Sequence, residues 1–320
     1  MEIIHTPVLL EETLSLLAPE AADEWMVDAT VGEGGHSFAF LSRFPGLRVT
    51  GIDVDREILA VARERLAVFA GRVRFHAGWS GDFFAETRNE AGEKPGRILI
   101  DLGISSFHYE KGRRGFSFRR DEELDMRLDP RYGESAGSLL RRLSERDLAD
   151  LLYRYGGERF SRRIARLVAG ERRRAPVFSS VSFAELVSRA VPPAFRRGPI
   201  HPATRSFQAL RIAVNGELEK LPALLEDALA ALKPGGRLGV ISFHSGEDRV
   251  VKNCFREKSR DSRRAAETPI KEKGEAAFRL VTPKPVVPGE DERRKNPPSR
   301  SAKLRVIEKT AFFGKSAGEG

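Results

Sequence analysis

The chain has 320 residues, of which 40% are hydrophobic and 32% charged, a composition that supports a folded protein with a sizeable core. Its 55 Lys and Arg residues outnumber 46 Asp and Glu residues, so the formal charge is +9 and the isoelectric point is near 9.8. This balance favours a polyanionic partner, either nucleic acid or an anionic membrane surface, although a generally solvated basic surface carries the same charge.

Cys254 is the only cysteine, which excludes an internal disulfide and a zinc cluster of the Cys-x-x-Cys kind. No other metal-site spacing is recognisable, so we expect no metal. The start of the chain lacks the basic region and long apolar run of a secretory signal. No segment reaches the length needed to span a membrane. We therefore expect a soluble, cytoplasmic protein without a membrane partner.

The first third of the sequence alternates short apolar runs with segments of helical periodicity. The apolar runs predict strands at 25–29, 47–53, 72–77 and 97–103, and the periodic segments predict helices at 36–43 and 56–69, with Asp55 as a helix N-cap. Strands that alternate with helices are typical of a parallel sheet with helices on both faces, so the fold class is α/β.

This alternation stops after residue 105, and no strand pattern appears before about Pro202. Such a stretch is too long for a loop in a compact domain. Helical periodicity predicts an inserted helical subdomain with helices at 135–143, 145–155, 158–171 and 182–190.

The α/β pattern then resumes with a helical stretch from about 204 to 232 and strand candidates at 237–243, 277–282 and 302–308. Residues 283–299 are rich in proline and charge and indicate a loop. We predict one discontinuous domain, 1–107 with 203–313, an insertion at 108–202, and a disordered tail at 314–320.

A glycine-rich turn follows the first predicted strand, in the run from Val27 to His36. Glycine lets the backbone approach a ligand closely, and the start of the next helix presents free N–H groups. Asp53 ends the second strand, where a carboxylate can accept both ribose hydroxyls of an adenosine. This pattern suits NAD and S-adenosylmethionine alike, but Ser37 stands where the dinucleotide fingerprint needs glycine. A tight turn without a ligand is the alternative.

Trp79 follows the third predicted strand, and Asp101 ends the fourth. The carboxyl ends of parallel strands meet at one crevice, where an aromatic ring could cover adenine and a carboxylate could meet a cationic or N–H group. Taken singly, Trp79 is more often a core residue and Asp101 more often a turn former. Four strand-end features at one crevice favour a binding site.

Nine motifs occur in order along almost the whole chain, and together they resemble one family. They are HTPVLLEE at 5–12, DATVGEGGH at 28–36, DLGISS at 101–106, RGFSF at 114–118, LDMRLDP at 124–130, YGGERF at 155–160, HPATRSFQALRI at 201–212, LKPGGRLGVISFHSGEDR at 232–249 and NPPSRSAKLR at 296–305. The set closely resembles the bacterial 16S ribosomal RNA cytosine-N4 methyltransferases, the small-subunit methyltransferase H family.

The resemblance implies a Rossmann-like S-adenosylmethionine methyltransferase fold with an inserted helical domain. It implies methylation of the exocyclic amine of a cytidine in the decoding region of 16S ribosomal RNA, free or in the small ribosomal subunit. Matched by position, the cofactor-binding residues are Gly34, Gly35, His36, Asp53, Trp79, Asp101 and His108. Two departures bear on this. The family's DLGVSSPQ is DLGISSFH here, which puts the role of His108 in doubt, and Gly246 replaces a leucine of FHSLEDR.

The cytosine amine is a poor nucleophile because its lone pair is delocalised into the ring. A carboxylate or carbonyl that accepts an N4–H bond would activate it. Other amino-methyltransferases place a Pro-Pro-aromatic motif after the fourth strand, and this chain has none there. We expect the loop from Asp101 to Phe107 to replace it, with Phe107 as a stacking surface. His244 and Glu247 are second candidates, and a helix-end role for His244 is at least as well supported.

The target amine should be unpaired or flipped out, because it is hard to reach inside a stem. Basic runs in and beside the insertion suit RNA phosphates, although any one run is more often a solvated helix face. They are Arg162, Arg163 and Arg166, then Arg172, Arg173 and Arg174, and also Arg113, Arg114, Arg119 and Arg120. Two alternatives stay open: methylation of another RNA or DNA base, and an RNA-binding assembly factor that only senses the cofactor.

Overall fold

The computed structural model describes residues 6–87, 92–172, 178–198, 200–260 and 277–310. Its contacts divide the chain into a sheet unit, Met1–Gly103 with Lys220–Gly320, and a helical unit, Ile104–Glu219. The expected limits of the insertion, 108 and 202, differ from these, and the expected tail at 314–320 lies outside the described residues. No helix in the described part of the chain is long and apolar enough to cross a membrane.

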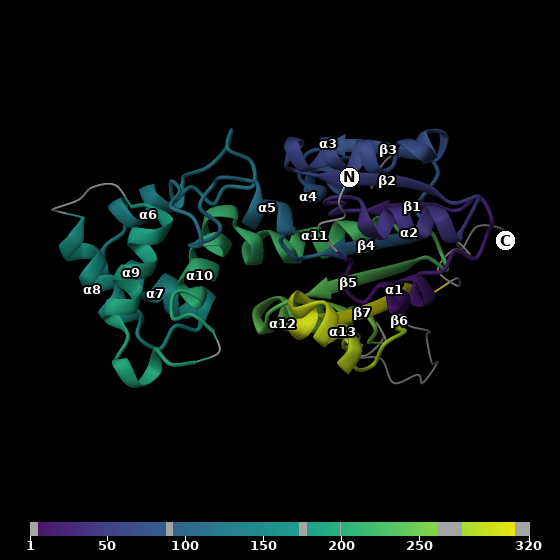
Figure 1. The fold of residues 1–320 in the computed structure, drawn as a ribbon. Coiled ribbons are helices and arrows are strands. Elements are labelled where there is room, and N and C mark those ends of the chain that lie inside the picture. Colours follow the sequence, from purple (N-terminus) through teal and green to yellow (C-terminus); the bar gives the residue numbers. More distant parts are fainter. Residues whose placement is uncertain (1–5, 88–91, 173–177, 199, 261–276, 311–320) are drawn as a thin grey trace, which may run out of the picture. The chain divides into compact units, whose positions relative to one another are not determined.

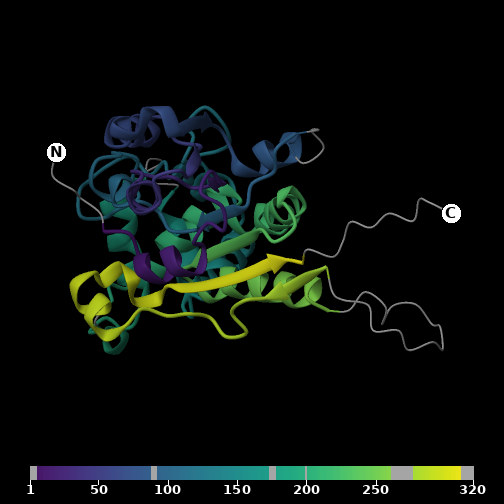
Figure 2. The ribbon, with the colours of Figure 1, turned by 90° about the vertical axis from the view of Figure 1, so that its right-hand side faces the viewer.

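The sheet unit contains seven strands in the order β3-β2-β1-β4-β5-β7-β6. The strands are β1 (Trp25–Asp28), β2 (Arg48–Asp53), β3 (Val73–Ala77), β4 (Arg97–Asp101), β5 (Arg237–Ser242), β6 (Phe278–Leu280) and β7 (Lys303–Lys309). All seven predicted strands are present. The first five are parallel, whereas β7 lies antiparallel between β5 and β6, as the yellow arrow of Figure 2 shows.

Helices cover both faces of this sheet, as the α/β pattern predicts (Figure 1). The helical elements of the unit are α1 (Leu10–Leu16), α2 (Gly35–Arg43), α3 (Arg56–Arg65), η1 (Ala67–Arg72), α4 (Ser80–Thr87), α11 (Glu217–Ala231), α12 (Ser245–Lys258), α13 (Glu290–Lys295) and η4 (Pro297–Ser301). One apolar core joins α1, α2 and α3 to one face, and a second joins α4, α11 and α12 to the other.

Helix ends show where local sequence decided the structure. Asp55 caps α3 by accepting a hydrogen bond from the Glu57 N–H at 2.9 Å, which confirms the predicted N-cap. The predicted helix 56–69 is shorter, because the chain continues as the 3-10 helix η1. The predicted loop 283–299 also contains helical turns, α13 and η4.

The helical unit contains α5 (Ser106–Glu110), α6 (Ala136–Arg142), α7 (Glu145–Gly156), α8 (Ser161–Glu171), α9 (Ser180–Ala190), η2 (Pro193–Phe195) and α10 (Thr204–Asn215). The single helix expected from 204 to 232 is two helices. Gly216 ends α10 in the left-handed region, at φ 62°, and α11 starts after it. Phe207 and Leu210 of α10 join the core of the helical unit, which explains why this unit extends beyond residue 202.

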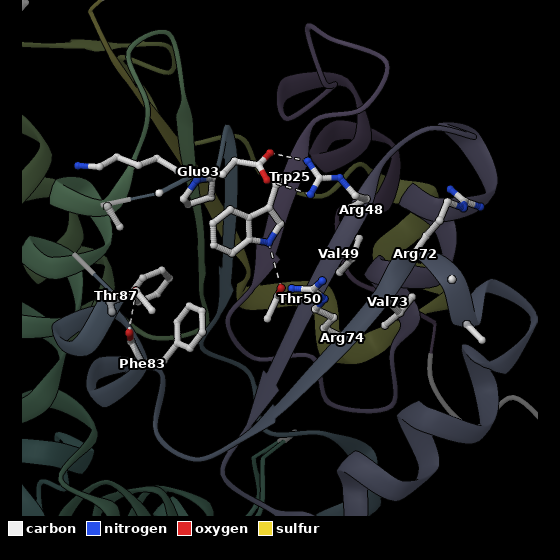
Figure 3. A pocket seen from close by; sticks show the side chains of 17 residues that line it. Trp25, Arg48, Val49, Thr50, Arg72, Val73, Arg74, Phe83, Thr87 and Glu93 are labelled. Carbon is white, nitrogen blue, oxygen red and sulfur yellow. Dashed lines mark hydrogen bonds and ion pairs between the residues drawn. The ribbon is translucent and has the colours of Figure 1, made fainter. Parts of the chain in front are cut away.

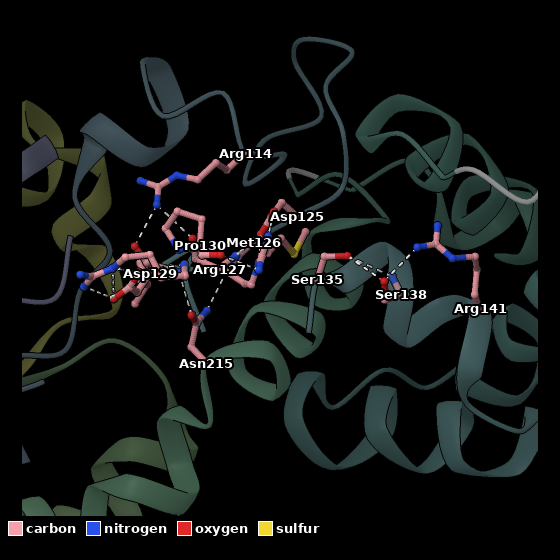
Figure 4. A network of polar contacts seen from close by, with 12 residues as sticks. Arg114, Asp125, Met126, Arg127, Asp129, Pro130, Ser135, Ser138, Arg141 and Asn215 are labelled. Carbon is pink, nitrogen blue, oxygen red and sulfur yellow. Dashed lines mark hydrogen bonds and ion pairs between the residues drawn. The ribbon is translucent and has the colours of Figure 1, made fainter. Parts of the chain in front are cut away.

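A polar network holds the LDMRLDP segment against α10 (Figure 4). Met126 is buried and left-handed, at φ 62°, a conformation that is strained for a bulky residue. The Asn215 side chain accepts a hydrogen bond from the Leu128 N–H and donates one to the Met126 carbonyl, both at 2.9 Å. Partial burial alone would raise the pKa of the Asp125 carboxyl. The guanidinium of Arg127 forms an ion pair with this carboxyl and lowers its pKa overall.

We predict that Asn215→Ala lowers the free energy of unfolding by about 3 kcal/mol, because it leaves buried backbone groups without partners. Urea denaturation measures the change. Arg205→Ala, an exposed position on the same helix, is the control and should cost about 0.5 kcal/mol or less. Equal stability of the two variants would contradict a stapling role for Asn215.

Candidate active site

Three carboxylates stand at the carboxyl ends of three neighbouring strands. Asp53 ends β2, Asp28 ends β1 and Asp101 ends β4, and these strands are adjacent in the order β2-β1-β4. Because the strands are parallel, the three side chains meet at one edge of the sheet. The sequence predicted roles for Asp53 and Asp101 at this edge.

The glycine-rich turn leaves β1 at the same edge and leads into α2. Gly32 and Gly34 have φ angles of 52° and 78°, a region that favours glycine. Gly34 is the N-cap of α2. A Cβ on Gly35 would stand 2.6 Å from the ring of Pro7, so the turn also packs too closely for a side chain there. The backbone angle of Gly34 and the close packing at Gly35 therefore explain why glycine stands at both predicted positions.

Asp53 is held by the backbone of this turn and of the next. Its two carboxylate oxygens accept hydrogen bonds from the N–H groups of Gly32 and Asp55, each at 3.0 Å. These two bonds orient the carboxylate, whose oxygens can also accept hydrogen bonds from hydroxyl donors. The arrangement is compatible with the predicted ribose contact.

Ser37 has a role of its own in the first turn of α2. Its hydroxyl donates a 2.6 Å hydrogen bond to the buried carboxylate of Asp28. Burial raises the pKa of Asp28, and the Ser37 hydrogen bond acts against that shift. Ser37, the residue that breaks the dinucleotide fingerprint, thus stabilises the charged form of Asp28.

His36 is buried beside these acids and is neutral. Burial lowers the pKa of His36. Its Nε2 lies 3.1 Å from the Val8 carbonyl oxygen, an acceptor, so Nε2 carries the proton of the neutral ring. Nδ1 then faces the Asp101 carboxylate, 3.8 Å away, without a proton. Burial therefore favours the neutral form of His36 at this edge of the sheet.

Asp101 is fixed from two sides. Its N–H donates to the Thr30 hydroxyl at 2.7 Å, and its Oδ1 accepts from the Gly103 N–H at 2.9 Å. Its side chain is 18% exposed, so the carboxylate is partly accessible to solvent at this edge of the sheet. Thr30 was missed by sequence analysis, although a hydroxyl beside a glycine turn is the signal that could have shown it.

Trp79 follows β3 and is half-buried in the sheet unit. The ammonium of Lys220, in the first turns of α11, lies 3.6 Å from the centre of its ring, in a cation–π contact. Ser80, the next residue, donates its hydroxyl hydrogen bond to the Ala29 carbonyl beside the glycine turn. These contacts tie Trp79 to the strand-end region, and Lys220 is a second residue that the sequence did not indicate.

His244 and Glu247 form the start of α12 after β5. The Nδ1 of His244 accepts from the N–H groups of Gly246 and Glu247, at 3.1 and 3.3 Å, and the buried Glu247 carboxylate accepts from the His244 N–H in return. This capping box gives His244 the helix-end role weighed above. A catalytic role for it stays a prediction.

Phe107 and His108 lie on α5 and belong to the helical unit. His108 is buried, with its ring 5.9 Å from Phe107 and 5.3 Å from Phe116. Gly34, Gly35, His36, Asp53, Trp79, Asp101 and His244 all belong to the sheet unit.

The sequence profile of the MraW methylase family matches residues 2–310. The chain belongs to the MraW methylase family. Among its relatives, the ribosomal RNA small subunit methyltransferase H of Treponema denticola is 50% identical over 98% of this chain and 99% of that protein. The protein of the same name from Treponema pallidum is 46% identical, over 96% and 93%. That from Crocosphaera subtropica is 44% identical, over 96% and 89%.

This methylase also has a pocket of about 490 Å³ at the other end of the sheet (Figure 3). Trp25, Arg48 and Val73, which begin β1, β2 and β3, line it, and the Trp25 ring donates to the Thr50 hydroxyl at 3.0 Å. None of the predicted site residues lines this pocket. In the described ranges no three His, Cys, Asp or Glu side chains form a group that could hold a metal.

We predict that the buried ring of His36 makes this methylase less stable in acid. Its pKa lies below the usual 6.5, so the unfolded chain takes up the proton first as the pH falls through 6.5. The free energy of unfolding then falls by up to about 1.4 kcal/mol per pH unit. In His36→Gln the contribution of His36 to the pH dependence of stability is absent, whereas Asp28 is unchanged.

Urea denaturation of both proteins from pH 7.5 to 5.5 tests this. The stability difference between the wild type and His36→Gln should shift against the wild type as the pH falls. A difference that is constant across this range would show that His36 is protonated as readily in the folded protein as in the unfolded one.

Proposed function

We propose that this methylase transfers the methyl group of S-adenosylmethionine to N4 of a cytidine in the decoding region of 16S ribosomal RNA. The observation that carries the proposal is the 44–50% identity, over nearly the whole chain, to proteins named ribosomal RNA small subunit methyltransferase H. The substrate implies a cytoplasmic site of action, on free 16S RNA or on the small subunit.

The charge of the strand-end crevice supports S-adenosylmethionine rather than a dinucleotide. Asp53 and Asp101 end β2 and β4 at this edge, and burial of the adjacent His36 favours its neutral form. A pyrophosphate would meet these carboxylates with like charge, whereas a sulfonium and an ammonium group complement them. Asp53 would hold the ribose and Trp79 would stack on adenine. The glycine turn at Gly34 and Gly35 would let the cofactor approach the protein main chain closely.

Bound S-adenosylmethionine supplies an electrophilic methyl group on a positively charged sulfur. Transfer of the methyl group to the amine nitrogen would leave the sulfur as a neutral thioether and release one amine proton, for which the Asp101 carboxylate is the proposed acceptor. The proposed role of Asp101 is to accept an N4–H hydrogen bond, and the support for it is that Gly103 and Thr30 hold Asp101 at the end of β4. Phe107 is the proposed stacking surface for the cytosine, and His108 a further cofactor contact.

The charge of the helical unit supports an RNA substrate. Residues 104–219 contain 23 Lys and Arg against 15 Asp and Glu, so +8 of the total charge of +9 belongs to this segment. Arg162, Arg163 and Arg166 are exposed on α8. A concentration of arginine in one unit favours phosphate contacts, with binding that weakens as salt rises. Arg173 and Arg174 of the predicted basic runs lie outside the described residues.

The direct test is transfer of a tritiated methyl group to small ribosomal subunits, free 16S RNA and duplex DNA, followed by mass-spectrometric mapping. We expect one N4-methylcytidine in the decoding region. Methylation of DNA or of another base would overturn the proposal. Cofactor binding without turnover, in a single-turnover assay, would favour an assembly factor that senses the cofactor.

We predict that Asp101→Asn lowers the rate of methyl transfer by about 100-fold while the cofactor still binds, because the amide accepts the amine proton less well. Isothermal titration measures cofactor affinity, and single-turnover assays measure the rate. Asp82→Asn, an exposed acid on α4, is the matched control. An unchanged rate in Asp101→Asn would exclude this role for Asp101.

A further inference from the structure

An aromatic side chain stands exposed on a rigid turn of the helical unit. Phe195 is 54% exposed and ends the short 3-10 helix η2, which begins with Pro193. The Phe195 N–H donates to the Pro192 carbonyl at 2.9 Å, and the two prolines restrict the backbone before it. The guanidinium of Arg196 bonds the Val191 carbonyl at 2.7 Å and anchors the turn to the end of α9.

The YGGERF motif supplies the support for this ring. Gly157 ends α7 in the left-handed region, and the buried carboxylate of Glu158 accepts from the Phe160 N–H at 2.9 Å. The ring of Phe160 then meets that of Phe195 at 5.3 Å, and the guanidinium of Arg159 lies over the Phe195 ring, 5.5 Å from its centre. The last residue of the YGGERF motif, Phe160, thus contacts the exposed ring of Phe195.

The sequence on both sides of Phe195 carries charge of one sign. From residue 186 to residue 216 the chain has no acidic residue and five arginines, and Arg196 and Arg197 directly follow the ring. Arg189 and Arg211 pair with Glu171 and Glu217, whereas Arg197 is exposed, and RNA supplies both a phosphate chain for this arginine and flat bases for Phe195. An exposed aromatic ring set among arginines is the usual arrangement for unpaired nucleotides.

We propose that Phe195, with Arg159 over one face, is a stacking platform for one unpaired base of the RNA substrate, and that Arg197 contacts a neighbouring phosphate. The inference rests on the proposed function only in that it assumes an RNA substrate. It assigns to the helical unit a second base contact, besides the one proposed for Phe107, in addition to general attraction for phosphates. The base is not the methylated cytosine, whose proposed contacts are Asp101 and Phe107.

Binding to single-stranded oligonucleotides tests the platform without any methyl transfer. The probes are a ten-nucleotide oligocytidylate and an abasic chain of the same length and charge. Phe195→Ala should weaken oligocytidylate binding about 5- to 150-fold, which corresponds to the range measured for base stacking, and leave abasic binding unchanged. Phe195→Tyr should restore the affinity. Tyr153→Ala is the matched control, since Tyr153 is a 67% exposed aromatic residue on α7 of the same unit.

The salt dependence separates stacking from phosphate contact. Arg197→Ala should reduce the slope of log affinity against log salt by about 1, and Phe195→Ala should leave the slope unchanged. Equal losses on abasic and base-containing chains, or no loss from Phe195→Ala in a folded protein, would overturn the platform. These outcomes are independent of whether 16S RNA is methylated, so failure of the platform and failure of the proposed function are distinguishable.

Discussion

Convergence of three carboxylates at one edge of a parallel sheet is the constraint on which the candidate site depends. Hydrogen-bond donors from the neighbouring turns and from α2 hold each of the three groups. Ser37 bonds Asp28, the Gly32 N–H bonds Asp53, and the Gly103 N–H bonds Asp101. The glycine turn is therefore part of an electrostatic scaffold as well as an opening for a ligand. An edge built in this way favours a cationic ligand over a pyrophosphate.

The two units differ in charge. The sheet unit carries the convergent acids, and segment 104–219 carries +8 of the net charge of +9. A positively charged methyl donor and a polyanionic substrate make opposite electrostatic demands, which one uniform surface could not meet. Placing the arginines in an inserted helical segment satisfies both demands with one chain. The Phe195 platform adds to this unit a contact that depends on bases.

Several motifs singled out in the sequence build the structure around the site. His244 and Glu247 of FHSGEDR cap α12, and Asp248 binds Arg305 at 2.7 Å, which ties α12 to β7. Burial raises the pKa of Asp248, but the hydrogen bonds and charges of Arg305 and Lys303 lower it overall. Two segments distant in sequence are thereby joined. A polar motif such as FHSGEDR therefore does not by itself show catalysis, because the same residue types can be needed to hold the backbone.

The sequence by itself determined the seven strands, the Asp55 cap, the strand-end positions of Asp53 and Asp101, and the presence of a helical insertion, because these follow from local periodicity and turn chemistry. Only the tertiary structure decided the antiparallel β7, the break at Gly216, the assignment of α10 to the helical unit, and the contacts of Thr30, Lys220 and Asn215. Each of these depends on residues far apart in the chain. The neutral state of His36 likewise depends on burial and on the Val8 carbonyl, which no local pattern encodes.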